Sequence, residues 1–119
     1  MSEQVYWIVD AVIKDGETEA FKALMAEMVA ATEANEPDTL NYEWTIAADG
    51  SRCHIFERYA NSAAVVTHLK WFGAECAERF MALAKPEGFT VYGNPDATAK
   101  KMLDGVGAVY FTPIGGFSR

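Results

Sequence analysis

Residues 40–69 read LNYEWTIAADGSRCHIFERYANSAAVVTHL, a pattern typical of a β-hairpin followed by a helix. Apolar and polar side chains alternate on both sides of Asp49-Gly50, a pair that favours a two-residue turn. With the turn placed there, antiparallel partners keep a constant sum of residue numbers, which fixes the register. The predicted partners are Tyr42 with Glu57, Trp44 with Ile55, and Ile46 with Cys53.

One face of this hairpin is apolar except for Glu57, which should therefore point into the core. The other members of that face are Leu40, Tyr42, Trp44, Ile46, Cys53, Ile55 and Tyr59. The opposite face is mixed and comprises Asn41, Glu43, Thr45, Arg52, His54, Phe56 and Arg58. A bulge at Gly50 would instead swap the two faces of one strand.

A helix is predicted after Asn61, whose side-chain oxygen can accept hydrogen bonds from the first backbone N–H groups. If this helix folds over the apolar face, it brings His68 to Glu57. An imidazole beside a buried carboxylate is a candidate acid/base pair. The alternative role is structural, because buried ionisable groups need partners and such a pair can tie a helix to a strand. We predict that the pair is buried and hydrogen-bonded between sheet and helix.

The remaining segments complete a βαββαβ order, which is typical of ferredoxin-like α+β folds with an antiparallel sheet. The expected elements are a central strand over residues 5–13, an amphipathic helix from Phe21 to Thr32, the hairpin, two helical runs separated near Trp71–Gly73, a short strand from Phe89 to Tyr92 and a capped helix that ends at Gly105. Pro86 should end the second of the two helical runs. The apolar tail from Val106 needs a surface to cover, either its own sheet edge or that of a partner chain.

The composition excludes several classes of function. A net charge of −7 argues against sequence-independent nucleic-acid binding, and the two cysteines of this 119-residue chain are too far apart for a zinc motif. The first residues lack the pattern of a secretion signal, and no apolar run approaches the ~20 residues of a membrane span. We expect a single domain over 1–119, with a core at 5–93 and a C-terminal extension at 94–119. We place it in the cytoplasm, with no nucleic-acid, membrane or metal partner.

The hairpin and its junction with the helix resemble the antibiotic biosynthesis monooxygenase superfamily. The resemblance is carried by the YEW strand at residues 42–44, the ERYANSAA junction at 57–64 and the HL pair at 68–69, and it spans roughly residues 5–93. It implies ferredoxin-like protomers that form a dimeric α+β barrel, and hence a homodimer that packs the mixed sheet faces together. The superfamily includes cofactor-independent monooxygenases of quinols and polycyclic phenols, haem-degrading enzymes and small proteins with no established activity.

The residues that haem-degrading members use are not found at the matching positions. Their strand Asn would fall near Val9, their helical Trp near His68, and their His near Glu78. None of the three residue types matches, which argues against haem degradation.

The enzyme hypothesis is therefore a cofactor-independent monooxygenase that oxidises a phenolic, quinol or polyketide-like aromatic substrate with O₂. Deprotonating a phenol gives an electron-rich anion that can reduce O₂, so the protein needs a base and a dry aromatic cavity rather than a cofactor. His68 would take the proton and Glu57 would orient its imidazole. The cavity wall would consist of Tyr42, Trp44, Tyr59, Trp71 and Phe72. The alternative is a non-catalytic small-molecule binder with the same fold, because a fold does not determine function.

Overall fold

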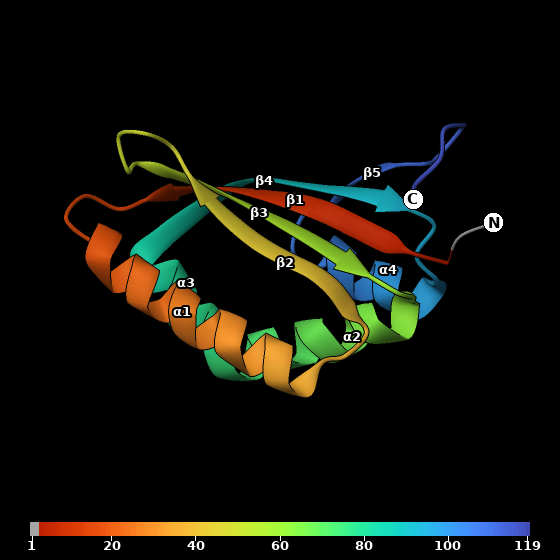
Figure 1. The fold of residues 1–119 in the computed structure, drawn as a ribbon, viewed down its shortest axis with the longest axis horizontal. Coiled ribbons are helices and arrows are strands. Elements are labelled where there is room, and N and C mark those ends of the chain that lie inside the picture. Colours follow the sequence, from red (N-terminus) through yellow and green to blue (C-terminus); the bar gives the residue numbers. More distant parts are fainter. Residues whose placement is uncertain (1–2) are drawn as a thin grey trace.

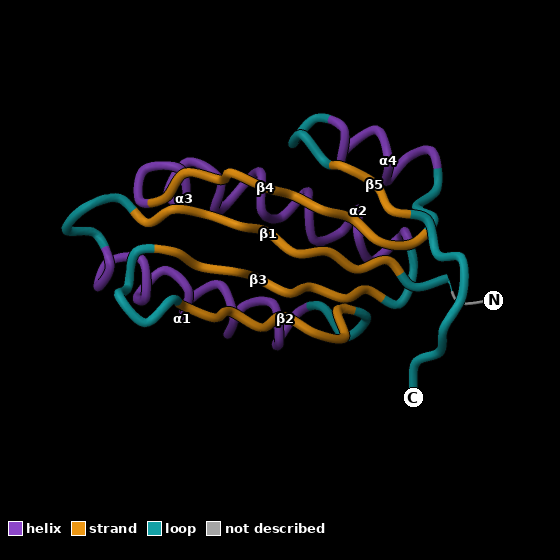
Figure 2. Tube along the Cα trace, turned by 90° about the horizontal axis from the view of Figure 1, so that it is seen from above, coloured by secondary structure: helices purple, strands orange, loops and turns teal. Residues whose placement is uncertain are grey.

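The computed structural model describes residues 3–119 as one sheet with all of its helices on one face (Figure 1). The elements are β1 (Val5–Ile13), α1 (Thr18–Asn35), β2 (Thr39–Ile46), β3 (Arg52–Tyr59), α2 (Ser62–Trp71), the π-helical turn η1 (Phe72–Cys76), α3 (Ala77–Leu83), β4 (Ala84–Gly93), α4 (Ala97–Asp104) and β5 (Val109–Phe111). The strand order is β2-β3-β1-β4-β5, and all neighbours are antiparallel except β4 and β5. This order confirms the ferredoxin-like α+β fold, and the sheet is open rather than closed on itself (Figure 2).

The predicted hairpin register is confirmed. The observed partners are Tyr42 with Glu57, Trp44 with Ile55, and Ile46 with Cys53. The connection is longer than a two-residue turn, since β2 ends at Ile46 and β3 begins at Arg52. Gly50 adopts a φ of 77°, which a residue with a side chain rarely does, and the Asp49 carboxylate accepts hydrogen bonds from Ser51.

The apolar face of the hairpin is shorter than predicted. The register shifts between Thr39 and Asn41, so that Leu40 leaves the regular alternation and is 41% exposed. Ile46 at the other end of β2 is 43% exposed, because β2 is an edge strand and the helical layer does not cover its ends.

The helix-covered face of β1 is buried, as the alternating pattern predicts. Its inward residues are Val5, Trp7, Val9, Ala11 and Ile13. Helix α1 packs beside β2 and α3, and its buried residues Phe21, Leu24, Met28 and Thr32 recur at helical spacing. Burial of these apolar surfaces is the main source of stability for the sheet–helix sandwich.

The helical segment after β3 changes its winding where the sequence predicts a break. Helix α2 begins with Asn61, whose side chain accepts from the Ala64 N–H, and it passes through the π-helical turn into α3. A π turn holds an extra residue, and such turns often occur at functional sites. The last helical run ends at Leu83 rather than beyond it.

Strand β4 is longer than the predicted strand and contains Pro86. The residues from Ala84 onward already pair with β1, and the register shifts between Asp10 and Ala11, next to Pro86. A proline lacks the N–H that a regular ladder needs, so it is tolerated at such an irregularity. Pro86 therefore marks a break in the sheet ladder and not the end of a helix.

The C-terminal segment covers the edge of its own sheet. Asp96 caps α4 by accepting from the Ala99 N–H, and β5 then runs parallel to β4. Beyond β5, Ile114 and Phe117 are exposed. No helix within residues 3–119 is long and apolar enough to cross a membrane.

Candidate active site

Three neighbouring strands place a row of side chains under helix α2. Glu57 on β3 lies opposite Tyr42 on β2 and opposite Trp7 on β1. All three point to the helix-covered face because alternate residues of a strand share a face. This row is the sheet side of the candidate site.

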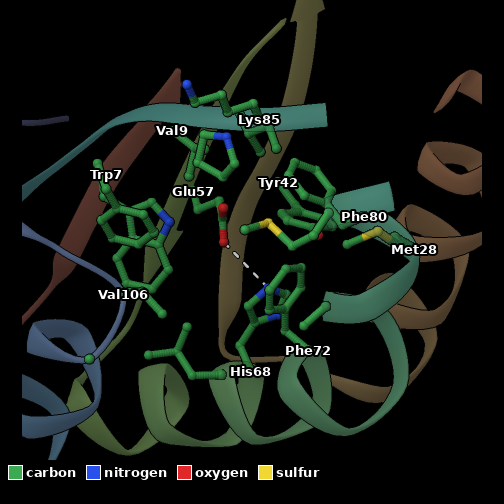
Figure 3. Close-up of a pocket in the computed structure, with 17 residues that line it drawn as sticks. Trp7, Val9, Met28, Tyr42, Glu57, His68, Phe72, Phe80, Lys85 and Val106 are labelled. Atoms are coloured by element: carbon green, nitrogen blue, oxygen red, sulfur yellow. Dashed lines mark ion pairs between the residues drawn. The ribbon is translucent and has the colours of Figure 1, made fainter. Parts of the chain in front are cut away.

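Helix α2 supplies the other side through His68. Ala64, Val65 and His68 are its buried residues, at the spacing of one helical face. The Nε2 atom of His68 lies 3.4 Å from Oε1 of Glu57, and both side chains are almost fully buried. Figure 3 shows the two side chains facing each other across the space between helix and sheet.

The shorter contact of His68 is with Glu36, which the sequence analysis did not select. Its Nδ1 atom lies 2.9 Å from Oε1 of Glu36, and that carboxylate also accepts a hydrogen bond of 2.9 Å from the Thr39 hydroxyl. Glu36 is the C-cap of α1, and the following Pro37 disfavours helical backbone at Glu36, which turns the chain out of the helix. His68 is thus held between two buried carboxylates, Glu36 and Glu57.

A signal for Glu36 was present in the sequence. An acidic residue at the C-terminus of a helix faces the negative end of the helix dipole, which is unfavourable by itself. An acidic residue at this helix end, directly before Pro37, therefore indicates a stabilising partner elsewhere in the fold. In the structure that partner is His68.

Burial controls the protonation of the groups around His68. Burial raises the pKa of Glu57, although His68 and the hydrogen bond from Tyr59 oppose that rise. Burial also raises the pKa of Tyr59 and of Tyr42, and the nearby Glu57 adds to both shifts. Both phenols therefore stay protonated, and the Tyr59 hydroxyl donates to Oε1 of Glu57.

Glu57 and His68 lie on the wall of a cavity of about 590 Å³, a size suited to a small organic ligand. The wall is otherwise mainly apolar and includes aromatic side chains from strands and helices (Figure 3). Its aromatic members are Trp7, Tyr42, Phe72, Phe80 and Phe89.

Some of the predicted wall residues line the cavity and others do not. Tyr42 and Phe72 line it as predicted. Trp44 lines a smaller hollow beside α1, because it lies one pair further along the hairpin. Tyr59 and Trp71 are not on the wall; their rings pack beside the His68 ring, with centroids 5.5 and 5.3 Å away.

Three aromatic wall residues were missed by the sequence analysis, namely Trp7, Phe80 and Phe89. The spacing of strand and helix residues assigned these three residues to the core or left them without a role. The space between them depends on how α3 packs against α1 and β4. The Trp7 ring packs at a tilt against Tyr59, with ring centroids 4.6 Å apart, and Trp7 lies opposite Glu57 in the sheet.

The acidic groups do not converge on one point. Glu36 and Glu57 contact opposite nitrogens of the His68 ring. In the part of the chain that the structure describes, no group of three or more His, Cys, Asp or Glu side chains could hold a metal ion. The arrangement instead suits proton transfer, because an imidazole between two carboxylates can accept and pass on a proton.

Comparison with known proteins shows the fold and the family of the chain. MupZ from Pseudomonas fluorescens is 24% identical, with 99% of this chain and 96% of that chain covered and a TM-score of 0.84. A variant of SnoaB, a cofactor-independent oxygenase from Streptomyces nogalater, is 16% identical, with coverages of 81% and 97% and a TM-score of 0.66. A conserved protein from Methanosarcina mazei Go1 is 12% identical, with coverages of 75% and 90% and the same TM-score of 0.66.

At these identities the solved structures show the fold alone. No curated protein matches the chain. The family profile described as antibiotic biosynthesis monooxygenase matches residues 6–84, which include the hairpin, Glu36, Glu57 and His68. Since this match covers most of its length, the chain belongs to the antibiotic biosynthesis monooxygenase family.

Proposed function

We propose that the protein is a cofactor-independent monooxygenase that oxidises a phenolic, quinol or polyketide-like aromatic substrate with O₂. The observation that carries this proposal is the buried Glu57–His68 pair on the wall of an aromatic cavity. Family membership supports the reaction type, and the mainly apolar, aromatic lining of the cavity supports a mainly apolar substrate.

The reaction begins with removal of the substrate's acidic proton by His68. Glu57 stabilises the imidazolium that forms, because the carboxylate lies next to Nε2. The substrate anion then passes one electron to O₂, and the two radicals combine at a ring carbon to give a peroxide. The imidazolium of His68 returns its proton to the peroxide. The hydroperoxide then loses water together with the hydrogen of the same ring carbon and leaves a carbonyl group, so that one oxygen atom enters the product and the other leaves as water.

The protein's part in this chemistry is to supply a base and to exclude bulk water. An apolar wall strengthens the electrostatic interaction between the imidazolium and the substrate anion. It also protects the reactive intermediates from side reactions.

The test is O₂ uptake by the pure protein with anthrones and naphthoquinols under air. We expect saturable O₂ consumption, with an aryl ketone or quinone as product. His68→Gln should lower kcat by about 10²–10⁴-fold, the usual contribution of a general base. His54→Gln, which changes the chain's other histidine, should leave kcat unchanged. Saturable binding without O₂ uptake would instead support the non-catalytic binder.

We further propose that the protein works as a homodimer that packs the helix-free sheet faces together. A row of aromatic rings crosses β3, β1, β4 and β5 on that face. Its members are Phe56, Tyr6, Tyr92 and Phe111, with successive ring centroids 6.3, 5.2 and 5.9 Å apart. Phe111 is exposed and the other three rings are partly exposed. Apolar surface left open to solvent in this way commonly marks an interface, and dimers are common in the family.

Sedimentation equilibrium at low micromolar concentration tests the dimer. An obligate dimer should bury well above ~1,600 Å² in total and stay associated at that concentration. Phe56→Glu places a charge in the aromatic row and should shift the protein to monomers. A stable, folded wild-type monomer would contradict the proposal.

A further inference from the structure

We propose that Glu36 is a positioning residue, which holds the ring hydrogen of His68 on Nδ1 so that Nε2 is the basic nitrogen toward Glu57 and the cavity. This inference deepens the proposed function and rests on it for the role of His68 as a base. It names a residue outside the cavity wall, since Glu36 is not among the residues that line the cavity.

The contacts of the ring carry the inference. The Nδ1–Glu36 distance of 2.9 Å is a normal hydrogen bond, whereas the Nε2–Glu57 distance of 3.4 Å is longer. In the proposed arrangement the Glu36 carboxylate accepts this bond, so its hydrogen belongs to Nδ1. A neutral imidazole has one hydrogen, which leaves Nε2 with a lone pair.

Glu36 is itself held in place from two directions. Its Oε1 accepts from the Thr39 hydroxyl, and its backbone carbonyl accepts from the Thr39 N–H at 3.1 Å. Its own N–H donates to the Thr32 carbonyl at the end of α1. The carboxylate that contacts His68 is therefore held in position by a hydrogen-bonded turn.

The opposite nitrogen faces the groups that would handle the proton. Glu57 lies at Nε2 and already accepts from Tyr59, and the rings of Tyr42, Tyr59 and Trp71 surround the imidazole. Both phenols keep their protons because burial raises the pKa of each. Glu57 is thus the group beside Nε2 that can share a proton with the imidazole.

The first experiment reads the tautomer by NMR of ¹⁵N-labelled histidine at neutral pH. The chain has two histidines, so His54→Gln identifies the signals of His68. In the wild type we expect a hydrogen on Nδ1 and an unprotonated Nε2. A hydrogen on Nε2 alone, or on both nitrogens, would overturn the proposal, and this measurement needs neither turnover nor a variant of Glu36.

The second experiment compares two substitutions of Glu36. Glu36→Met removes the acceptor, so the ring hydrogen should move to Nε2, where Glu57 is the remaining acceptor. Glu36→Gln keeps a side-chain oxygen and should retain the Nδ1 hydrogen. Thr39→Val is the matched control, because it removes the other bond to Glu36 without touching His68, and it should also retain the wild-type tautomer.

Kinetics with a substrate that supports O₂ uptake give an independent measure. Glu36→Met should lower kcat by about 10²-fold or more and leave KM within about threefold, since Glu36 acts through His68 and does not contact the substrate. Glu36→Gln should recover most of the loss. An equal loss in both variants with unchanged tautomers would overturn the proposal. Absence of O₂ uptake in the wild type, with the expected tautomers, would refute the proposed function and leave the role of Glu36 supported.

Discussion

The two faces of the sheet each carry a histidine next to a carboxylate, and burial separates them. On the helix-covered face, His68 and Glu57 have side chains only 3% and 7% exposed. On the open face, Nε2 of His54 lies 3.5 Å from Asp10, and these side chains are 56% and 33% exposed. Similar residue types at similar distances therefore have very different electrostatic surroundings.

The difference shows that distance alone does not identify a site. Water around the outer cluster screens its charges, and Arg52 neutralises Asp10 through a hydrogen bond of 2.9 Å. The inner pair lies away from water, and burial there raises the pKa of Glu57. Perturbed groups of this kind, when they line a cavity, are candidates for catalysis.

The largest difference between the buried and the exposed cluster should appear in the free energy of unfolding when each histidine is removed. His68→Ala leaves two buried carboxylates without their shared partner, and we expect it to lower the free energy of unfolding by about 3–5 kcal/mol at pH 7. His54→Ala removes a solvent-exposed contact and should cost less than about 1 kcal/mol. Urea denaturation of both variants measures the difference. Equal losses would show that burial does not distinguish the two clusters.

A smaller contrast should appear in the pH dependence of stability. Burial raises the folded-state pKa of Glu57 above its ordinary value of about 4.3. At pH values between the ordinary pKa and the raised folded-state pKa of Glu57, the folded state binds more protons than the unfolded state. The contribution of Glu57 to stability therefore falls as pH rises. The difference in unfolding free energy, wild type minus Glu57→Gln, should therefore decrease with rising pH, by at most about 1.4 kcal/mol per pH unit.

Glu27→Gln is the matched control for that experiment. The hydrogen bond from Arg79 lowers the pKa of Glu27, which is the opposite direction. The difference in unfolding free energy, wild type minus Glu27→Gln, should therefore rise with pH. The rise should be small, because solvent screens this exposed pair. A wild-type-minus-Glu57→Gln difference that rises with pH would contradict the assignment of Glu57.

The smallest effect should come from the outer cluster. Asp10→Asn weakens the pair with Arg52, whose side chain is 42% exposed, and should cost less than about 1 kcal/mol in urea denaturation. Asp10 lies four residues along β1 from Tyr6 of the aromatic row, so a small loss is compatible with a dimer contact centred on that row. A loss of 3 kcal/mol or more would mean that the dimer contact extends over this ion pair as well, because only a covered ion pair is that costly to break. The measurement therefore also bears on the proposed dimer.

Most of the hairpin could be predicted because its information is local. Alternation and the Asp49-Gly50 pair fix both the register and the inward direction of Glu57, and the structure confirms both. The ends of β2 and the start of β4 could not be predicted in this way. A register shift near Leu40 and another near Pro86 depend on how neighbouring strands fit together.

The candidate site was only partly predictable, for a similar reason. Glu57 and His68 follow from strand and helix periodicity. Glu36 reaches His68 from a distant turn, and the space between Trp7, Phe80 and Phe89 depends on side-chain packing between layers. Periodicity tells which side chains point inward, but it does not tell where inward-pointing side chains fail to fill the interior.

The π-helical turn at Phe72–Cys76 makes the cavity wall sensitive to the deletion of a single residue. It separates His68 and Leu69 from Ala77 and Phe80, all of which line the cavity, and it is equivalent to one residue inserted into a regular helix. Deleting the Gly73 codon would restore regular winding and turn the following helix by about 100° relative to α2. Phe80 would then leave the cavity wall. A change of one codon is enough to add or remove one side of this cavity without altering any apolar residue.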